Sequence, residues 1–152
     1  MLYFTYECKV DAKGRILLPS GLKKELAAVL DEGFVIKKSV FFKCLELYPK
    51  AKWVKELEII DGLDKFDEDN LNFIRTHIAW VKPVELDNNG RILIPKELLG
   101  FAEIEKDIVI SSQVTKMEIW NKSNYDKIVN DTAANYGNLA KKAMSSIKKP
   151  GE

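Results

Sequence analysis

Two short stretches of the sequence combine residue types that bind nucleic acid: DAKGR at residues 11–15 and DNNGR at residues 87–91. In each stretch an aspartate begins a tight turn and a glycine is free to adopt positive φ. An arginine follows each glycine, and its planar guanidinium can bind a phosphate or a guanine edge with two hydrogen bonds. An arginine paired with a nearby carboxylate is the structural alternative. A turn needs only the aspartate and the glycine, so an arginine in both stretches favours nucleic-acid binding.

The two stretches differ in local charge. Residues 9–15 carry three basic residues and one acidic residue, whereas residues 85–91 carry one basic and two acidic residues. The whole chain has a net charge of only +1, and two of its three arginines stand in these stretches. The first stretch is therefore predicted to bind DNA more strongly. The candidate DNA contacts are Lys9, Lys13, Arg15 and Arg91, and the turn residues are Asp11, Gly14, Asp87 and Gly90.

Few residues in the sequence indicate a metal site, a cofactor site or a catalytic site. His77 is the single histidine, without metal-ligand spacing to another histidine or a cysteine, so we expect no metal and no cofactor. Asp11 and Asp87 could form a catalytic carboxylate pair, but turn-forming aspartates that accept backbone hydrogen bonds explain them better. We expect no enzymatic activity and no catalytic residues. Cys8 and Cys44 are interpreted as reduced cysteines in a cytoplasmic protein.

The elements that must position the two stretches are themselves repeated. The spacing of the repeat is 76 residues, the distance in sequence from Asp11 to Asp87. Alternating apolar residues predict a strand before each turn, a short apolar strand after it, and an amphipathic helix after the next proline. Two further strands follow in each half. The predicted strands after the helices span 34–37, 44–48, 108–111 and 117–120, and the helices span 22–30 and 98–102. One half has too small a core to be stable alone.

Helices are predicted between and after the repeats. Pro49 suits the start of a helix with Trp53, Leu57 and Ile60 on one face, and Asp67 or Asp69 suits the cap of a second. The second helix is expected to turn Leu71, Ile74 and Ile78 inward, and a third is expected from Ser123 through Val129. The basic tail beyond Tyr136, which includes Lys148 and Lys149, is expected to fray. The tryptophans Trp53, Trp80 and Trp120 are expected in the core or in subunit contacts.

Composition and length describe an ordinary globular chain. The sequence has 152 residues, 46% hydrophobic and 31% charged. No apolar run approaches the roughly 20 residues of a membrane helix, and the N-terminus MLYFTYECKVD lacks the pattern of a signal peptide. We expect a cytoplasmic protein without a membrane partner.

The sequence resembles the MraZ family of bacterial transcriptional regulators in the order of four motifs. The motifs are DAKGRILLP, CLELYPKAKW, DNNGRILIP and MEIW, and the resemblance covers the chain up to about Tyr125. The family motif Asp-x-Lys-Gly-Arg matches Asp11, Lys13, Gly14 and Arg15 in full. In the second copy Asn89 replaces the lysine, which agrees with the weaker local charge.

The resemblance implies an α+β fold: a pseudo-twofold, swapped-hairpin β-barrel of the AbrB type, duplicated in one chain, with flanking helices. It implies SpoVT-AbrB-type units at residues 5–52 and 82–126, a helical linker at 53–81, and a C-terminal helix and basic tail at 127–152.

The resemblance also implies a homo-oligomeric ring on the nucleoid that binds double-stranded DNA at direct repeats ahead of the division and cell-wall gene cluster. We expect subunit contacts at Leu2, Tyr3 and Phe4 and at the helix that carries Trp53. Two alternatives stay open: an AbrB-like antitoxin or transition-state regulator that reads a palindrome, and a ring scaffold that does not bind DNA.

Overall fold

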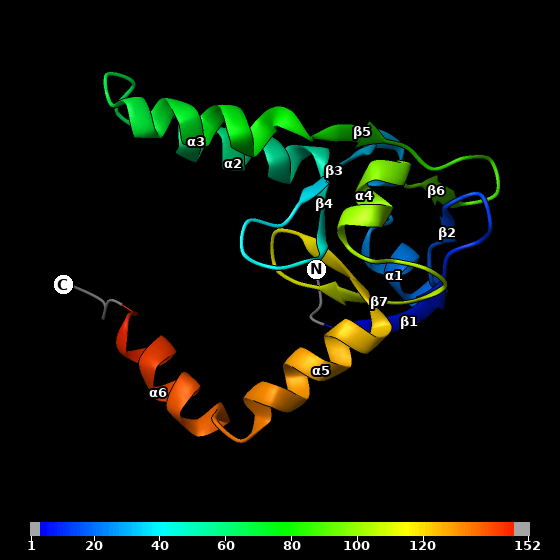
Figure 1. The fold of residues 1–152 in the computed structure, drawn as a ribbon. Coiled ribbons are helices and arrows are strands. Elements are labelled where there is room, and N and C mark those ends of the chain that lie inside the picture. Colours follow the sequence, from blue (N-terminus) through cyan, green and yellow to red (C-terminus); the bar gives the residue numbers. More distant parts are fainter. Residues whose placement is uncertain (1–3, 148–152) are drawn as a thin grey trace. The chain divides into compact units, whose positions relative to one another are not determined.

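The computed structural model describes residues 4–147, and the chain divides into two compact units between residues 122 and 123 (Figure 1). The first half of the larger unit contains β1 (Thr5–Lys9), β2 (Arg15–Leu17), α1 (Ser20–Glu25), the 3₁₀ turn η1 (Leu30–Glu32), β3 (Phe34–Lys38) and β4 (Leu45–Pro49). A helical hairpin follows, α2 (Lys50–Asp61) and α3 (Glu68–Ala79). The second half contains β5 (Lys82–Val84), β6 (Arg91–Leu93), α4 (Lys96–Phe101), β7 (Asp107–Ser112) and β8 (Met117–Asn121). The last helices are α5 (Lys122–Ala133) and α6 (Tyr136–Ser145).

The strands form a six-stranded antiparallel sheet in the order β1-β7-β8-β4-β3-β5 and a separate ribbon of β2 and β6. The order is the same from either end once equivalent strands of the two halves are exchanged, so a pseudo-twofold axis relates the halves. The axis passes between Glu46 and Glu118, which are opposite each other in β4 and β8, and between Ile16 and Ile92 in the ribbon.

Each half lends its first strand to the other half. β1 pairs with β7, and β5 pairs with β3, so neither half holds a complete sheet of its own. This exchange confirms the expected α+β class and the duplicated, swapped arrangement. The described strands are ordered with β1 and β5 at the ends of the sheet rather than in a closed barrel.

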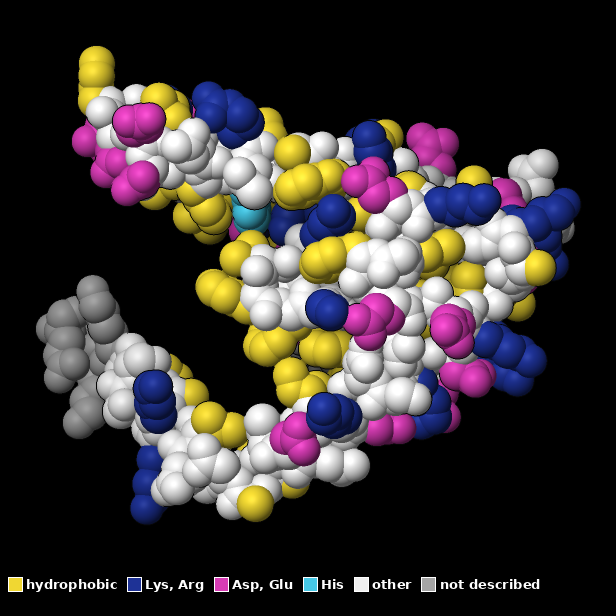
Figure 2. Space-filling model, in the orientation of Figure 1, with side chains coloured by type: hydrophobic (Ala, Val, Ile, Leu, Met, Phe, Trp, Pro, Cys, Tyr) yellow, Lys and Arg dark blue, Asp and Glu magenta, His cyan; other side chains and the backbone are white. Residues whose placement is uncertain are grey.

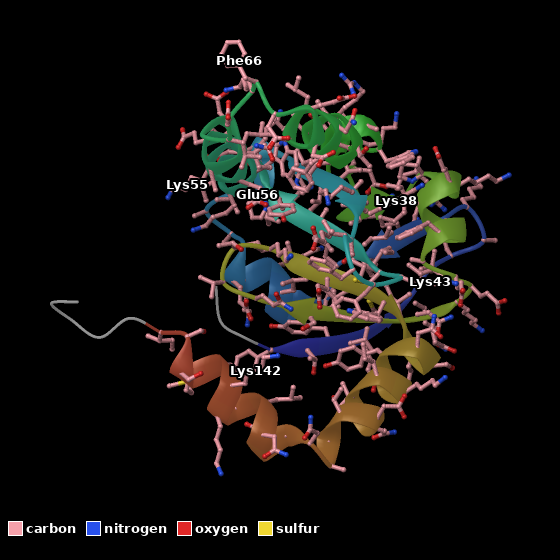
Figure 3. All side chains as sticks on the ribbon, turned by 60° about the vertical axis from the view of Figure 1, so that its left-hand side comes forward. Lys38, Lys43, Lys55, Glu56, Phe66 and Lys142 are labelled. Carbon is pink, nitrogen blue, oxygen red and sulfur yellow. The ribbon has the colours of Figure 1, made fainter. Side chains whose placement is uncertain are left out.

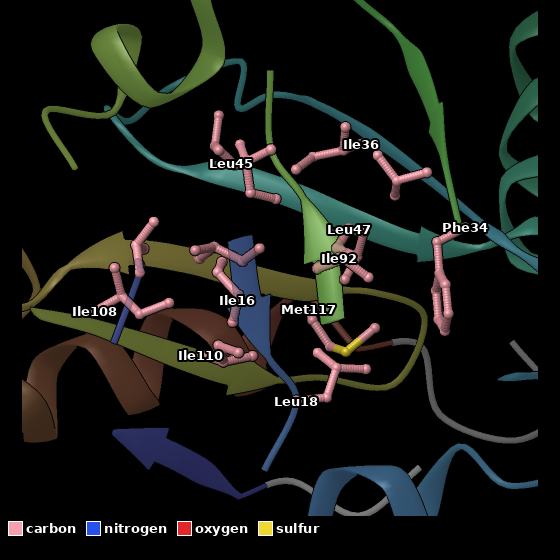
Figure 4. Close-up of a cluster of buried hydrophobic side chains, with 14 of the residues drawn as sticks. Ile16, Leu18, Phe34, Ile36, Leu45, Leu47, Ile92, Ile108, Ile110 and Met117 are labelled. Carbon is pink, nitrogen blue, oxygen red and sulfur yellow. The ribbon is translucent and has the colours of Figure 1, made fainter. Parts of the chain in front are cut away.

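One apolar core joins the two halves. Ile16 and Ile92 are fully buried where the ribbon lies against the sheet, among residues from β3, β4, β7 and β8 (Figure 4). Leu22 and Leu98, the equivalent residues of α1 and α4, close this core with 0% and 1% of their surface exposed. Burial of about a dozen large side chains contributes about 1.5–3 kcal/mol each, before the entropy of ordering the chain is subtracted.

The helix after the first ribbon strand is shorter than its sequence predicts. α1 ends at Glu25, and residues 26–32 continue as turns in which Val29 donates to the Leu26 carbonyl, a bond of the tighter three-residue type. Leu26 is still buried and Val29 and Leu30 still pack against the core. Turns and a 3₁₀ segment present the same apolar residues to the core, so the pattern alone did not define the helix end.

Both helices of the α2–α3 hairpin begin after the expected residues, Pro49 and Asp67, but the burial of α3 differs from the prediction. Asp67 caps α3, accepting a 2.9 Å hydrogen bond from the Asp69 amide. Leu71 and Ile78 are exposed rather than inward, and Ile74 is half-buried. Instead His77 faces α2, where its ring stacks on Trp53 with the centroids 5.9 Å apart, and Phe73 lies beside His77 on α3.

The chain beyond Tyr136 also differs from its prediction, because most of it is the helix α6 rather than a frayed tail. Leu2, Tyr3, Lys148 and Lys149 lie outside the described residues. Within the described part of the chain, no helix is long and apolar enough to cross a membrane.

Candidate nucleic-acid interface

Each candidate turn is built by its aspartate. Asp11 Oδ1 accepts hydrogen bonds from the amides of Lys13 and Arg15, both at 2.9 Å. Asp87 Oδ1 accepts equivalent bonds from Asn89 and Arg91 at 2.8 and 3.0 Å. These backbone bonds lower the pKa of both carboxyl groups below the usual value, with the bond from the arginine amide contributing most. The aspartates are therefore ionised structural acceptors of the turns.

The glycines have the backbone conformation that the sequence predicts. Gly14 has φ +82° and Gly90 has φ +75°, in the left-handed region that other residues rarely adopt. A side chain at Gly14 would also press against Leu99 and the carbonyl of Ile94, so the surrounding atoms disfavour any residue larger than glycine there.

The two turns interlock at one end of the larger unit (Figure 1). The Ile94 amide donates to the Gly14 carbonyl at 2.9 Å, and the Leu18 amide donates to the Gly90 carbonyl at 3.4 Å. Each turn is thus held by the strand that follows the other turn. Loops fixed in this way keep a defined spacing between their arginines, as base or phosphate recognition requires.

The outer face of the β2–β6 ribbon brings the two arginines together. Ile16 and Ile92 point into the core, so their neighbours in each strand point outward. Arg15 is opposite Leu93, and Arg91 is opposite Leu17, and both leucines are more than half exposed. The result is a surface of two arginines and two leucines around the pseudo-twofold axis. The exposed leucines were missed from sequence, although strict alternation from Ile16 would have indicated them.

The arginines differ in their side-chain partners. Arg15 Nε forms a 2.8 Å ion pair with Asp11 Oδ2, and about a third of each side chain remains exposed. Among the described residues no carboxylate lies within ion-pair distance of the Arg91 guanidinium. The structural alternative for arginine, a local ion pair, is therefore present in the first turn only. An exposed ion pair of this kind is weak and leaves the guanidinium available to a stronger acceptor.

Basic residues reach each turn from the other half of the chain. A side chain built at Gly90 would collide with the ammonium group of Lys23, so this α1 lysine covers the second turn. Lys13 of the first turn lines a groove of about 550 Å³ together with Lys96 of α4. Both lysines are far in sequence from the turn they approach, so no local pattern predicts their position there. Lys9 is exposed on β1, opposite Asp107 in β7.

The remaining candidates for chemistry are metal-ligating side chains and the two cysteines. Within residues 4–147 no group of three or more histidine, cysteine, aspartate or glutamate side chains could hold a metal ion. Cys8 and Cys44 are free thiols, and burial raises the pKa of Cys8 to about 11 and that of Cys44 to about 12. These thiols are protonated at neutral pH and hence poor nucleophiles.

Comparisons with known proteins agree with the repeat. A family model described as "MraZ protein, putative antitoxin-like" matches residues 1–72 and 81–146. A transcriptional regulator MraZ from Christiangramia forsetii is 51% identical over 142 residues, covering 93% of this chain and 92% of that protein. The Flavobacterium psychrophilum protein of the same name is 48% identical over 143 residues, covering 94% and 91%. A third, from Cytophaga hutchinsonii, is 37% identical over 144 residues, covering 95% of both chains. The chain therefore belongs to the MraZ family.

Proposed function

We propose that the protein is a sequence-specific, DNA-binding transcriptional regulator, as the names of its relatives suggest. The observation that carries the proposal is the outer face of the β2–β6 ribbon. Two rigid Gly-Arg turns present Arg15 and Arg91 from one surface, with Leu17 and Leu93 between them. Arginines can form paired hydrogen bonds with guanine, while exposed apolar side chains suit the methyl group of thymine.

The proposed contacts divide by role. Arg15 and Arg91 read base edges, and Lys9 and Lys13 bind phosphates. Lys23 and Lys96 add positive charge beside the second and the first turn, respectively. The second turn has Asn89 where the first turn has Lys13, and Lys23 partly compensates for this missing lysine. Six basic side chains per chain give moderate affinity, so several chains must act together for tight binding.

We further propose that the protein is a ring-shaped homo-oligomer in the cytoplasm, associated with the nucleoid. Its proposed targets are direct repeats ahead of the division and cell-wall gene cluster. The ring supplies multiple identical turns along one duplex, which compensates for the modest affinity of each. Phe4, 56% exposed, and the outward α2 residues Val54 and Ile59 are candidate contacts between copies. Trp53 itself is buried against Tyr48 within one chain.

Fluorescence anisotropy tests the proposal. The probes are a duplex from the region upstream of the protein's own gene and a shuffled duplex of the same composition, each at two salt concentrations. We expect preference for the upstream duplex, lost in Arg15→Ala with the fold intact. Equal binding to both duplexes would refute sequence-specific regulation. Binding to an inverted repeat by a dimer would favour the palindrome-reading alternative, and an oligomer that binds neither duplex would favour the scaffold.

A further inference from the structure

An uncovered apolar groove lies beside the α2–α3 hairpin of the larger unit. We call it the hairpin groove; its volume is about 320 Å³, and its apolar wall consists of Val40, Phe41, Phe42 and Phe73. All four side chains are more than two-fifths exposed, and Phe41 is 85% exposed. Figure 2 shows hydrophobic side chains gathered beside the single histidine, on the side of the hairpin that faces the sheet. A cluster of exposed aromatic side chains of this kind marks a surface that another molecule covers.

Acidic groups border the hairpin groove. Glu56 of α2 lines it and keeps about a third of its side chain exposed (Figure 3). Glu118 also lines it and accepts hydrogen bonds from Gln113 and Trp120. Glu46, a third carboxylate there, is paired with Lys37 and with Lys116, which also lines the groove. From Glu56 to Asp69 the hairpin carries seven carboxylates and only one lysine, Lys65. The groove therefore suits an apolar segment with basic edges.

The smaller unit contains a helix of that description. No residue of α6 is buried, and Tyr136, Leu139 and Ala143 recur at helical spacing on one face. Leu139 is 43% exposed and Tyr136 is 75% exposed. Lys142 borders this face, Lys141 lies on the opposite side of the helix, and α6 has no acidic residue. An amphipathic helix of 10 residues is not stable alone in water, so its apolar face requires a partner.

We propose that α6 of one copy docks in the hairpin groove of a second copy. The apolar face of α6 would cover Phe41, Phe42 and Phe73, and Lys142 at its border would meet Glu56 and the acidic hairpin. Donor helix and acceptor groove are different surfaces, so the contact is head-to-tail and can close into a ring. The inference rests on the proposed oligomer and names the surfaces that form it.

Two single substitutions and their mixture test the contact in the full-length protein. Phe41→Asp disables the groove but keeps the helix, and Leu139→Asp disables the helix but keeps the groove. We expect each variant alone to have the mass of one chain, 17.4 kDa, by light scattering. Mixed in equal amounts, they should form a complex of twice that mass, because one intact helix meets one intact groove. Docking of α6 in its own groove would give no complex.

Matched controls separate the contact from general effects of charge. Asn138→Asp adds a charge to the polar side of α6, and Ala51→Asp adds one to an exposed position of α2 outside the groove. Both should keep the wild-type mass, and circular dichroism should show all four variants folded. A folded variant Phe41→Asp or Leu139→Asp that stays oligomeric, a mixture that does not pair, or a monomeric wild type would overturn the inference. A wild-type oligomer that fails to bind DNA would refute the proposed function and leave the docking intact.

Discussion

At the scale of single residues, the two arginines of the ribbon make the most direct prediction. Arg15→Ala should weaken specific DNA binding more than Arg91→Ala. The turn of Arg15 also contains Lys13, whereas the turn of Arg91 has the uncharged Asn89 at the equivalent position. A paired arginine contact contributes about 1–3 kcal/mol of discrimination between bases. Titrations of a target duplex and a shuffled duplex measure it. Arg75→Ala, on α3, where the guanidinium donates to Asn72 of the same helix, is the control. A larger loss in Arg91→Ala would contradict the asymmetry.

The lysines should act differently from the arginines. Lys13→Ala and Lys23→Ala should each weaken binding to all sequences alike, since a lysine on a phosphate carries no base information. Each should reduce the slope of log affinity against log salt by about 1. Lys24→Ala removes the neighbouring exposed lysine of α1, which does not cover the Gly90 turn, and should leave the slope nearly unchanged. An unchanged slope in Lys23→Ala would show that this lysine does not approach the DNA.

At the scale of elements, the packing of α3 on α2 depends on a neutral histidine. The His77 side chain is 5% exposed, and neither ring nitrogen has a hydrogen-bond partner among residues 4–147. The nearest Glu56 carboxylate oxygen is 3.8 Å from Nε2. Burial lowers the pKa of His77 below 6.5, with the charge of Lys37 adding to the effect and Glu56 opposing it. The folded hairpin thus retains the neutral ring at pH values where an unfolded chain takes up a proton.

This histidine predicts a pH-dependent stability. Above about pH 6.5 both states are neutral and stability is complete, and it falls as pH drops from there toward the lowered folded pKa. His77→Phe, which keeps the stacking on Trp53, should lose less stability between pH 7 and pH 5.5 than the wild type. Chemical denaturation at a series of pH values measures the difference. Parallel curves for the two proteins would show that His77 does not titrate on unfolding.

The sequence predicted which elements exist better than what each one contacts. The 76-residue repeat located the turns and the ribbon strands, and Pro49 and Asp67 located the α2–α3 hairpin, because period and capping residues are local properties. Lys23 was missed because its approach to Gly90 depends on the exchange of strands between halves, which no local pattern contains. The inward face assigned to Leu71 and Ile78 was wrong for a related reason. Apolar periodicity identifies a face that needs cover, and that cover can come from another molecule.

At the scale of the whole molecule, the proposed ring predicts the layout of its operator. Head-to-tail copies present their turns in the same orientation, so the matching DNA pattern is a direct repeat. Turns on one side of the ring meet the same groove once per helical turn, about every 10–10.5 bp. Inserting about 5 bp between two boxes should abolish cooperative binding, and a full-turn insertion should spare part of it. Footprinting measures both, and full cooperativity at the half-turn spacing would contradict the ring.

The pseudo-twofold axis between Ile16 and Ile92 also bears on how such a protein can change. In a dimer of identical chains, every mutation appears twice, so both DNA-reading turns improve or fail together. Here the two turns are encoded separately, and a mutation alters one of them alone. Lys13 and Asn89 already show such independence at equivalent positions, as do Lys23 and Leu99. Selection can therefore adjust one turn for a new base while the other holds the protein on its DNA.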